Sequence, residues 1–256
     1  MHLWQYLILF VAVLIGGLLA MFFGDKLPKY IKSLTAFSGA FLFGLVISSI
    51  LPGVYASGEH WVGVLVLLGF FTQFLLEHVL HGHDHSLEHK HEHFHNSSYA
   101  ISILAGLTVH SFLDGMPLNA MLDGVQQVPQ EGGHHHGHNH THLVGSLIWA
   151  LFFHKITDAF ALVFIMLDSG WKKRSILLTL LLFATITPLG TYAISNMVAH
   201  NLISLKTLNY GMAFLMGGFL HIGTTILLET EQGQHRIEPQ KLIAIVFGFL
   251  VAILLG

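Results

Sequence analysis

The chain has 256 residues, of which 53% are hydrophobic and only 10% are charged. Soluble domains carry about 25% charged residues, so this chain lacks the polar side chains that a water-facing globular surface needs. Its net charge of −3 offers no basic field that would attract nucleic acid. Because cysteine is absent, disulfides, thiolate metal sites and iron–sulfur clusters are excluded. The unusual count is 21 histidines, most of them clustered.

Apolar runs of about 20 residues predict an all-α, polytopic bundle of eight transmembrane helices that forms a single domain over residues 1–256. The predicted spans cover residues 3–23, 33–51, 61–80, 98–121, 143–167, 174–197, 205–228 and 240–255. The first run is too long for the apolar region of a signal peptide and lacks a basic start. We therefore interpret it as a true span.

Lysine and arginine are distributed unevenly among the predicted loops. Nine of the ten cations in or at the edges of the predicted loops belong to odd-numbered loops, and only Lys206 belongs to an even-numbered one. Positive residues favour the cytoplasmic side, so an even number of spans puts both termini outside. The two longer loops are rich in histidine. This orientation places the loop at 81–96 in the cytoplasm and the loop at 123–142 outside the cell.

The fourth and fifth spans each contain His-x-x-x-Asp, as His110/Asp114 and His154/Asp158. Residues four apart lie on one helix face, about 6 Å apart along the axis. A charge at the bilayer centre costs at least about 2.5–3.5 kcal/mol, and a divalent cation would compensate the two carboxylates. Imidazole nitrogen and carboxylate oxygen suit Zn²⁺, Fe²⁺ and Mn²⁺. Consecutive spans are antiparallel, which sets His110 level with Asp158 and Asp114 level with His154. We therefore predict a near-tetrahedral metal site. The alternative is a hydrogen-bond network without metal.

Two further residues shape this prediction. Lys155 follows His154 and stands three residues before Asp158, so it can neutralise part of that charge and discourage a second metal. Pro117 frees a backbone carbonyl, which is common where a helix bends around a cavity.

At these residues the chain resembles the ZIP family of Zrt-, Irt-like metal transporters. The family's fourth-span motif, His-Ser/Asn-x-x-Glu-Gly, is matched at 110–115 by His-Ser-Phe-Leu-Asp-Gly, and its fifth-span His-Lys or His-Glu is matched at 154–155. Thr-Pro-Leu-Gly at 187–190 is similar to a sixth-span motif of the family. Asp114 replaces the usual Glu. Lys155 takes the position that binds a second metal in two-metal members, so the resemblance implies one central metal.

The resemblance also implies a function. It implies import of a divalent metal into the cytosol along spans four and five, with zinc as the first candidate and iron or manganese as alternatives. The metal is the transported substrate, no cofactor is expected, and the protein is not expected to be an enzyme. The resemblance further implies a homodimer. We expect the protein to lie in a lipid bilayer, either a plasma membrane or a bacterial inner membrane.

Several other polar residues are candidates for the metal's pathway. The candidates are Ser111, Lys155, His221, Glu77 and His78. His221 is either a further ligand or gate, or a histidine that hydrogen-bonds between helices. Glu77 and His78 end the third span, where metal would leave, but a solvated helix end is the alternative.

The histidine-rich loops offer weak, exchangeable metal ligands. We interpret the outer loop as a metal collector and the inner loop as an acceptor or sensor, with a disordered polar linker as the alternative for each. The candidate capture residues are His81, His83 and His85 in the inner loop, and His134, His135, His136 and His138 in the outer loop.

Three rival functions remain open at this stage. Cation-diffusion-facilitator exporters also pair two His-x-x-x-Asp motifs, but they have six spans, place the motifs on the second and fifth, and move metal outward. A membrane metalloenzyme is disfavoured because the histidines at 81, 83 and 85 alternate in a polar loop, without the three- or four-residue spacing of helical histidine boxes. The third rival is a metal sensor that binds without transporting.

Overall fold

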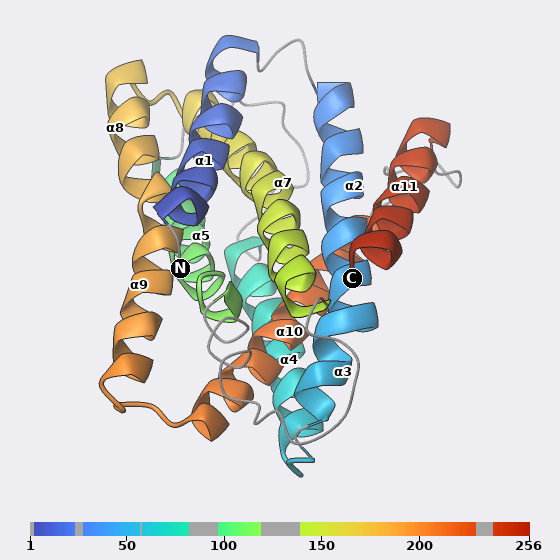
Figure 1. Cartoon of the computed structure of the whole chain (residues 1–256). Helices are drawn as coiled ribbons and strands as arrows, with labels where there is room; N and C mark the ends of the chain where they lie inside the picture. The colour runs from blue at the N-terminus through green and yellow to red at the C-terminus, as the bar shows by residue number, and fades with distance from the viewer. Residues whose placement is uncertain (1–2, 24–27, 57, 82–96, 119–138, 229–237) are drawn as a thin grey trace.

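The structure is a computed structural model that describes residues 3–23, 28–56, 58–81, 97–118, 139–228 and 238–256. All regular structure in these ranges is helical (Figure 1). The helices are α1 (Leu3–Phe23), α2 (Pro28–Leu45), η1 (Val46–Ile50), α3 (Leu51–Tyr55), α4 (Val62–His81), α5 (Ser97–Leu113), α7 (Asn139–Asp168), α8 (Lys173–Ala184), α9 (Ile186–Ala199), α10 (Leu205–Leu228) and α11 (Pro239–Leu255).

These helices fall on the eight apolar segments that the sequence predicts, and the all-α prediction is confirmed for the described residues. α1 and α10 have the predicted bounds. Six of the described helical segments are long and apolar enough to cross a membrane, judged by length and composition. Two shorter apolar segments, Val62–Leu76 and Pro239–Leu255, correspond to the third and eighth predicted spans. Three predicted boundaries differ by four or five residues. The helical segment of the second span begins at Pro28 and continues to Tyr55, and α7 begins at Asn139, so its first turn takes in residues 139–142 of the predicted outer loop.

Three of the predicted spans are interrupted near a proline. The second span passes through the π-helical turn η1 before Pro52, and the sixth is divided at Thr185, just before Pro188. α5 stops at Leu113 and the chain is helical again at 116–118, around Pro117. Proline has no N–H to donate, so the carbonyl four residues earlier loses its helical partner and the helix breaks or bends.

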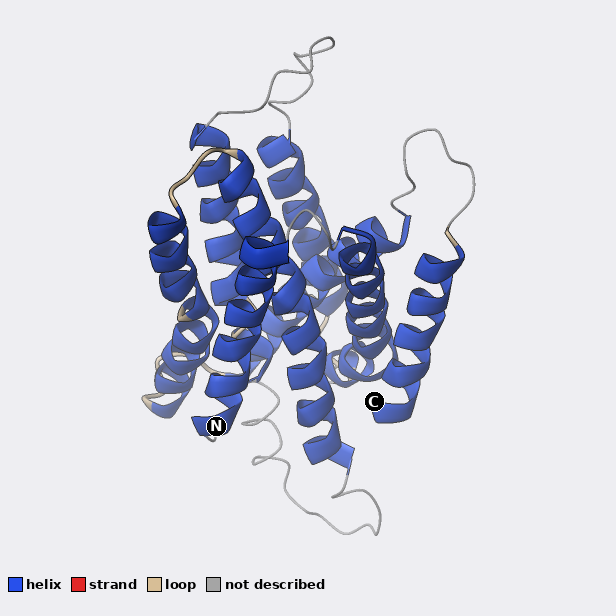
Figure 2. Ribbon diagram, turned by 90° about the horizontal axis from the view of Figure 1, so that it is seen from above, coloured by secondary structure: helices blue, strands red, loops and turns tan. Residues whose placement is uncertain are grey.

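The helices form two groups, which α7 connects. In one group α1 packs on α7 and α8, and α5 packs on α9. In the other, α4 packs on α10, and α2 packs on α10 and α11. α7 also packs on α2, and it stands between α1 and α2 in Figure 1. Both termini lie toward the same end of the bundle (Figure 2).

The described residues contain two large apolar clusters, and α5 and α7 contribute to both. Residues 144–153 of α7 belong to one cluster with α2 and α10, whereas residues 159–167 belong to the other with α1 and α8. In α5, apolar residues between Ala100 and Leu107 belong to the second cluster. Leu113 at its end, and Met116 and Leu118 just after it, belong to the first. His110 and His154 therefore lie at the junction between the two clusters.

Candidate metal centre

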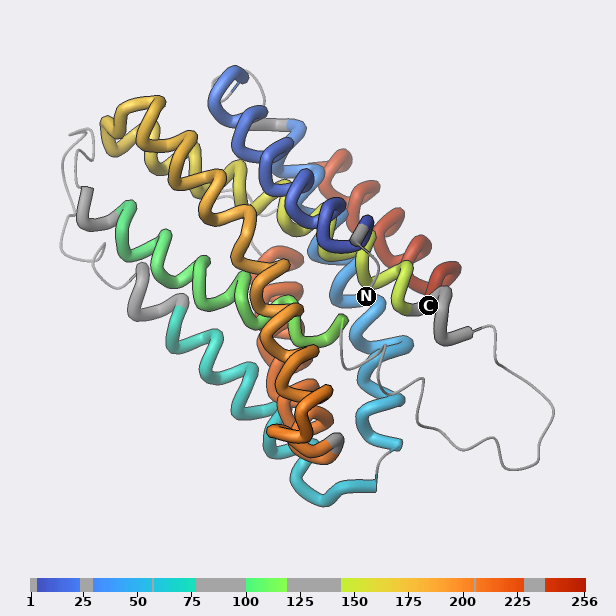
Figure 3. The backbone as a smooth tube through the Cα atoms, turned by 60° about the vertical axis from the view of Figure 1, so that its left-hand side comes forward, coloured from blue at the N-terminus to red at the C-terminus, as the bar shows by residue number. Residues whose placement is uncertain are grey.

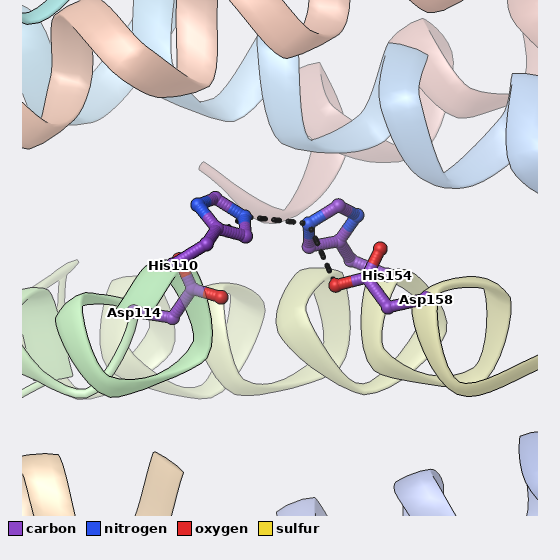
Figure 4. A group of neighbouring side chains, drawn as sticks. All are labelled: His110, Asp114, His154 and Asp158. Atoms are coloured by element: carbon purple, nitrogen blue, oxygen red, sulfur yellow. Dashed lines mark hydrogen bonds and ion pairs between the residues drawn. The ribbon is translucent and has the colours of Figure 1, made fainter. Parts of the chain in front are cut away.

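The structure brings the four residues of the two His-x-x-x-Asp pairs together. His110 lies in the last turn of α5, Asp114 follows the end of that helix, and His154 and Asp158 lie in the middle of α7. One ligand atom from each residue lies within 4.8 Å of all the others. Figure 4 shows the two imidazoles facing each other, with the two carboxylates beside them. The arrangement brings two nitrogen and two oxygen ligands from two helices to one point.

The distances between the ligand atoms fit a single small ion. Nε2 of His110 lies 3.4 Å from Nε2 of His154 and 3.6 Å from Oδ1 of Asp114. Nε2 of His154 lies 3.4 Å from Oδ2 of Asp158. In a tetrahedral zinc site with bonds of about 2.0–2.1 Å, neighbouring ligand atoms are about 3.3–3.4 Å apart. These three pairs already have nearly that separation.

Lys155 joins the two carboxylates from the side. Its ammonium group is fully buried, and it donates to the carboxylate of Asp114. It also donates to the hydroxyl of Ser111 at 3.0 Å and to Oδ2 of Asp158 at 3.4 Å. The predicted contact to Asp158 is therefore present, but helical spacing alone did not show the contacts across to α5. Ser111 serves here as an acceptor for the lysine.

The site has both the negative charge and the free acceptor atom that would favour binding of a cation. Two carboxylates and one ammonium leave one formal negative charge when the imidazoles are neutral. Oδ1 of Asp114 is buried and receives no hydrogen bond from the described residues. An unsatisfied buried polar atom of this kind costs about 1–3 kcal/mol, and more when it is charged. A bound divalent cation would relieve that cost.

The comparison with known proteins identifies the family. The chain matches the family model described as ZIP zinc transporter over residues 2–256. The chain belongs to the ZIP family. The resemblance that the fourth- and fifth-span motifs indicated is therefore confirmed. Since the family match agrees with the long apolar helices, the chain is an integral membrane protein.

Individual relatives are similar at lower identity. "Zinc transporter ZIP9" of Micropogonias undulatus is 26% identical over 211 residues, which cover 76% of this chain and 63% of that protein. "Zinc transporter ZIP9" of Xenopus tropicalis is 26% identical, and "Zinc transporter ZIP9-B" of Xenopus laevis is 27% identical. Each of these alignments covers 77% of this chain and 65% of the relative. The chain thus spans less than two thirds of the length of these relatives.

A glycine sets the position of Asp114 in this ZIP-family chain. The Asp114 N–H still donates to the His110 carbonyl at 3.0 Å, and the helix breaks at Gly115. A Cβ on Gly115 would lie 2.4 Å from the backbone nitrogen of Thr191 in α9. Only glycine allows α9 to pack so closely here. The tight packing holds the end of α5, and with it Asp114, against the bundle.

The cross-helix pairing differs in detail from the prediction. The sequence set each histidine level with the aspartate of the other helix, and α5 and α7 do run in opposite directions (Figure 3). All four ligand atoms lie within 4.8 Å, but the direct hydrogen-bond contact between the two motifs joins the imidazoles of His110 and His154. Their rings meet edge to face, with centroids 5.7 Å apart.

His221 lies apart from the four-residue group. Its ring contacts Phe70 and Phe74 of α4 at centroid distances of 5.0 and 5.8 Å. Its Nε2 lies 3.5 Å from the hydroxyl of Thr225. The ring therefore packs between α10 and α4, while its contact with Thr225 lies within α10. The ligand or gate role and the hydrogen bond between helices stay predictions.

The remaining predicted pathway and capture residues lie outside the part of the chain whose side chains the structure describes. Glu77, His78 and His81 belong to α4, but only their backbone is described. The other capture residues, which are His83, His85, His134, His135, His136 and His138, lie in the undescribed segments 82–96 and 119–138. Their metal-capture roles stay predictions.

A cavity of about 180 Å³ lies beside the site, and two of the four candidate ligands line it. His110 and Asp114 form part of its wall, and residues of α4 and α10 form the rest. Its other polar side chains include Thr72 and Gln73, which were not predicted to be site residues. A signal was available, because they are the only polar side chains between Val62 and Leu76.

Proposed function

We propose that this protein carries a divalent transition metal, with zinc as the first candidate, across the membrane into the cytosol. The metal would bind at one site made by His110, Asp114, His154 and Asp158. The observation that carries this proposal is the meeting of four ligand atoms within 4.8 Å at the junction of two apolar clusters. The relatives reported above are named as zinc transporters, which supports zinc. Iron and manganese accept the same ligand types and remain alternatives.

Lys155 supports a site for one metal. With neutral histidines, two carboxylates, one ammonium and one divalent ion sum to +1. A second divalent ion beside the ammonium would meet repulsion of about 4 kcal/mol per unit charge at 4 Å, with an effective dielectric constant of 20. The ammonium group of Lys155 thus supplies the positive charge that a second metal ion would otherwise provide beside the carboxylates.

The proposed path runs inward through eight spans with both termini outside. The outer loop at 123–142 would collect metal, and the inner loop at 81–96 would accept it after it passes Glu77 and His78. The homodimer that the resemblance implies belongs to the same proposal. Family membership argues against the exporter alternative, because the fourth- and fifth-span motifs are those of the ZIP family.

The metalloenzyme alternative retains one sequence feature. Residues 91–95 read His-Glu-His-Phe-His, which has the spacing of zinc-protease motifs, and they lie outside the described residues. The ZIP relatives are named as transporters, and the four-residue group lies elsewhere, between α5 and α7. We therefore retain transport as the function and keep sensing as an outcome of the test.

Metal flux into proteoliposomes tests the proposal. Purified protein is reconstituted in one orientation around a metal-sensitive dye, and uptake of Zn²⁺, Fe²⁺ and Mn²⁺ is measured for the wild type and for His154→Ala. Loss of outer-shell partners already lowers metal affinity by about 10–100-fold, so loss of a direct ligand should lower flux at limiting metal by at least about 100-fold. His60→Ala is the matched control, because His60 is exposed and contacts Trp61 just before the start of α4.

Three results would contradict parts of the proposal. Equal flux in the wild type and His154→Ala would refute the role of the four-residue site in transport. Flux driven only from the cytoplasmic face outward would favour an exporter. Metal binding without flux, in protein whose insertion has been verified, would favour a sensor.

A further inference from the structure

We infer that Gln73 of α4 is a transient metal ligand on the route from the central site toward the His81 end of α4. The inference rests on the proposed function and adds a residue to it. Gln73 shares the cavity of about 180 Å³ with His110 and Asp114. A water molecule takes about 30 Å³ in the liquid, so the cavity has room for a partly hydrated ion.

The cavity lies where the two groups of helices face each other. α4 and α10 form one side of it, and α5 forms the other. Figure 3 shows α4 and α5 side by side. An ion that leaves His110 and Asp114 on this side meets α4 next, and the polar groups there come from Thr72 and Gln73.

Close packing of α4 on α10 fixes where Gln73 stands. A Cβ on Gly69 would lie 1.7 Å from the carbonyl oxygen of Phe214, and one on Gly217 would lie 1.9 Å from that of Val66. These glycines hold the two backbones in contact. One turn further along α4, a Cβ on Gly218 would have the Cβ of Gln73 as its nearest neighbour, at 3.9 Å. The two helices therefore leave space at Gln73 that they do not leave at Gly69.

The amide of Gln73 forms no hydrogen bond with the described part of the chain that would explain its position. The residue is half-buried. A polar amide moved into an apolar environment without a partner costs about 1–3 kcal/mol by protein mutational data. A ligand or water in the cavity would satisfy it.

Further candidate ligands follow Gln73 along α4 toward His81, the last residue of the helix. Gln73, Glu77 and His81 are spaced four residues apart, so they occupy neighbouring positions on one helix face in steps of about 6 Å. The last of them begins the histidine-rich sequence at 81–96. Oxygen and imidazole groups thus recur at regular spacing along a helix that is otherwise apolar between Val62 and Leu76 apart from Thr72.

An amide side chain is suited to binding a metal ion weakly and briefly. Its carbonyl oxygen can coordinate a divalent cation but carries no formal charge, so it holds the ion less tightly than Asp114 does. An ion can therefore pass Gln73 without being trapped. A carboxylate at this position would form a second, stronger site.

Separate measurements of flux and affinity test the inference. Gln73→Leu keeps the volume and removes the amide. We expect zinc flux into proteoliposomes to fall about tenfold, while the equilibrium zinc affinity of the detergent-solubilised protein stays within twofold of wild type. Gln73→Glu restores an oxygen ligand, and at low zinc its flux should exceed that of the leucine variant at least threefold. The matched control is Gln240→Leu, an exposed residue of α11, which should leave both values within twofold.

The failures of the two proposals are distinguishable. If the wild type carries zinc and Gln73→Leu carries it equally well, the role of Gln73 is refuted and the central site stands. If Gln73→Leu loses affinity together with flux, Gln73 supports the central site or the fold and is not a step on a route. If the wild type carries no metal at all, the transport proposal fails and this one fails with it.

Discussion

Replacing Lys155 with methionine separates the charge of this side chain from its bulk. Methionine fills a similar apolar volume but provides no ammonium group. In the metal-free protein the variant leaves Asp114 and Asp158 facing each other without the cation that contacts both. Removing one partner of a buried ion pair costs about 3–5 kcal/mol, because the remaining charge stays buried and uncompensated. We therefore expect Lys155→Met to be among the most destabilising single substitutions in the chain.

Thermal unfolding in detergent, with a chelator present, measures this effect. For proteins of 150–250 residues about 1 kcal/mol shifts the midpoint by about 2–4 °C, so the expected loss is at least about 6 °C. Lys206→Met is the matched control. Lys206 also pairs with a carboxylate, Glu59, at 2.9 Å, but its side chain is 58% exposed, so its loss should change the midpoint far less.

Added zinc should stabilise Lys155→Met more than it stabilises the wild type. A ligand at 100 times its Kd stabilises the folded state by about 2.7 kcal/mol. In Lys155→Met the metal also supplies the missing positive charge, so the zinc-induced shift should be larger than in wild type. A variant that unfolds within 2 °C of wild type in chelator would refute the reasoning. So would a zinc shift of equal size in both proteins.

Two smaller changes test the packing beside Asp114 and the ion pair between Glu59 and Lys206. Gly115→Ala brings a Cβ to 2.4 Å from the backbone of Thr191, so we expect thermal unfolding to show a loss of about 1–3 kcal/mol in stability. Gly145→Ala is the control, because its Cβ would meet nothing within 4 Å and the change should be neutral or stabilising. Equal unfolding midpoints for the two variants would contradict the close approach at Gly115. The hydrogen bond from Lys206 holds the pKa of Glu59 below its usual range, so this pair stabilises the fold at neutral pH and loses its effect as the pH falls through the lowered pKa. Glu59→Gln should therefore lower the unfolding midpoint at pH 7 but not in acid, and a pH-independent difference would contradict that assignment.

The spans and the candidate ligands were predictable because both follow from short-range rules. A helix of about 20 apolar residues satisfies its own backbone, so the bilayer selects it whatever its neighbours are. His-x-x-x-Asp places two ligands on one face by helical periodicity alone. Two such pairs on consecutive spans were enough to indicate the group that the structure brings within 4.8 Å.

The helix breaks were only partly predictable. Pro117 indicated a bend in the fourth span, but the division of the sixth span at Thr185 and the π-helical turn before Pro52 were missed. Each proline removes one hydrogen bond, but the position at which the helix yields depends on what packs against it. At Gly115 that partner is the backbone of α9.

The contacts between helices were decided by tertiary structure alone. Composition, span positions and the histidine–aspartate spacing were determined by the sequence, because each depends on residues within a few turns of one another. The reach of Lys155 to Asp114, the packing of His221 against Phe70 and Phe74, and the place of Gln73 in the cavity all depend on how neighbouring helices rotate and cross. Close contacts between distant segments, such as Gly69 against Phe214 and Gly115 against Thr191, contribute to those angles, and no local pattern in one helix contains them.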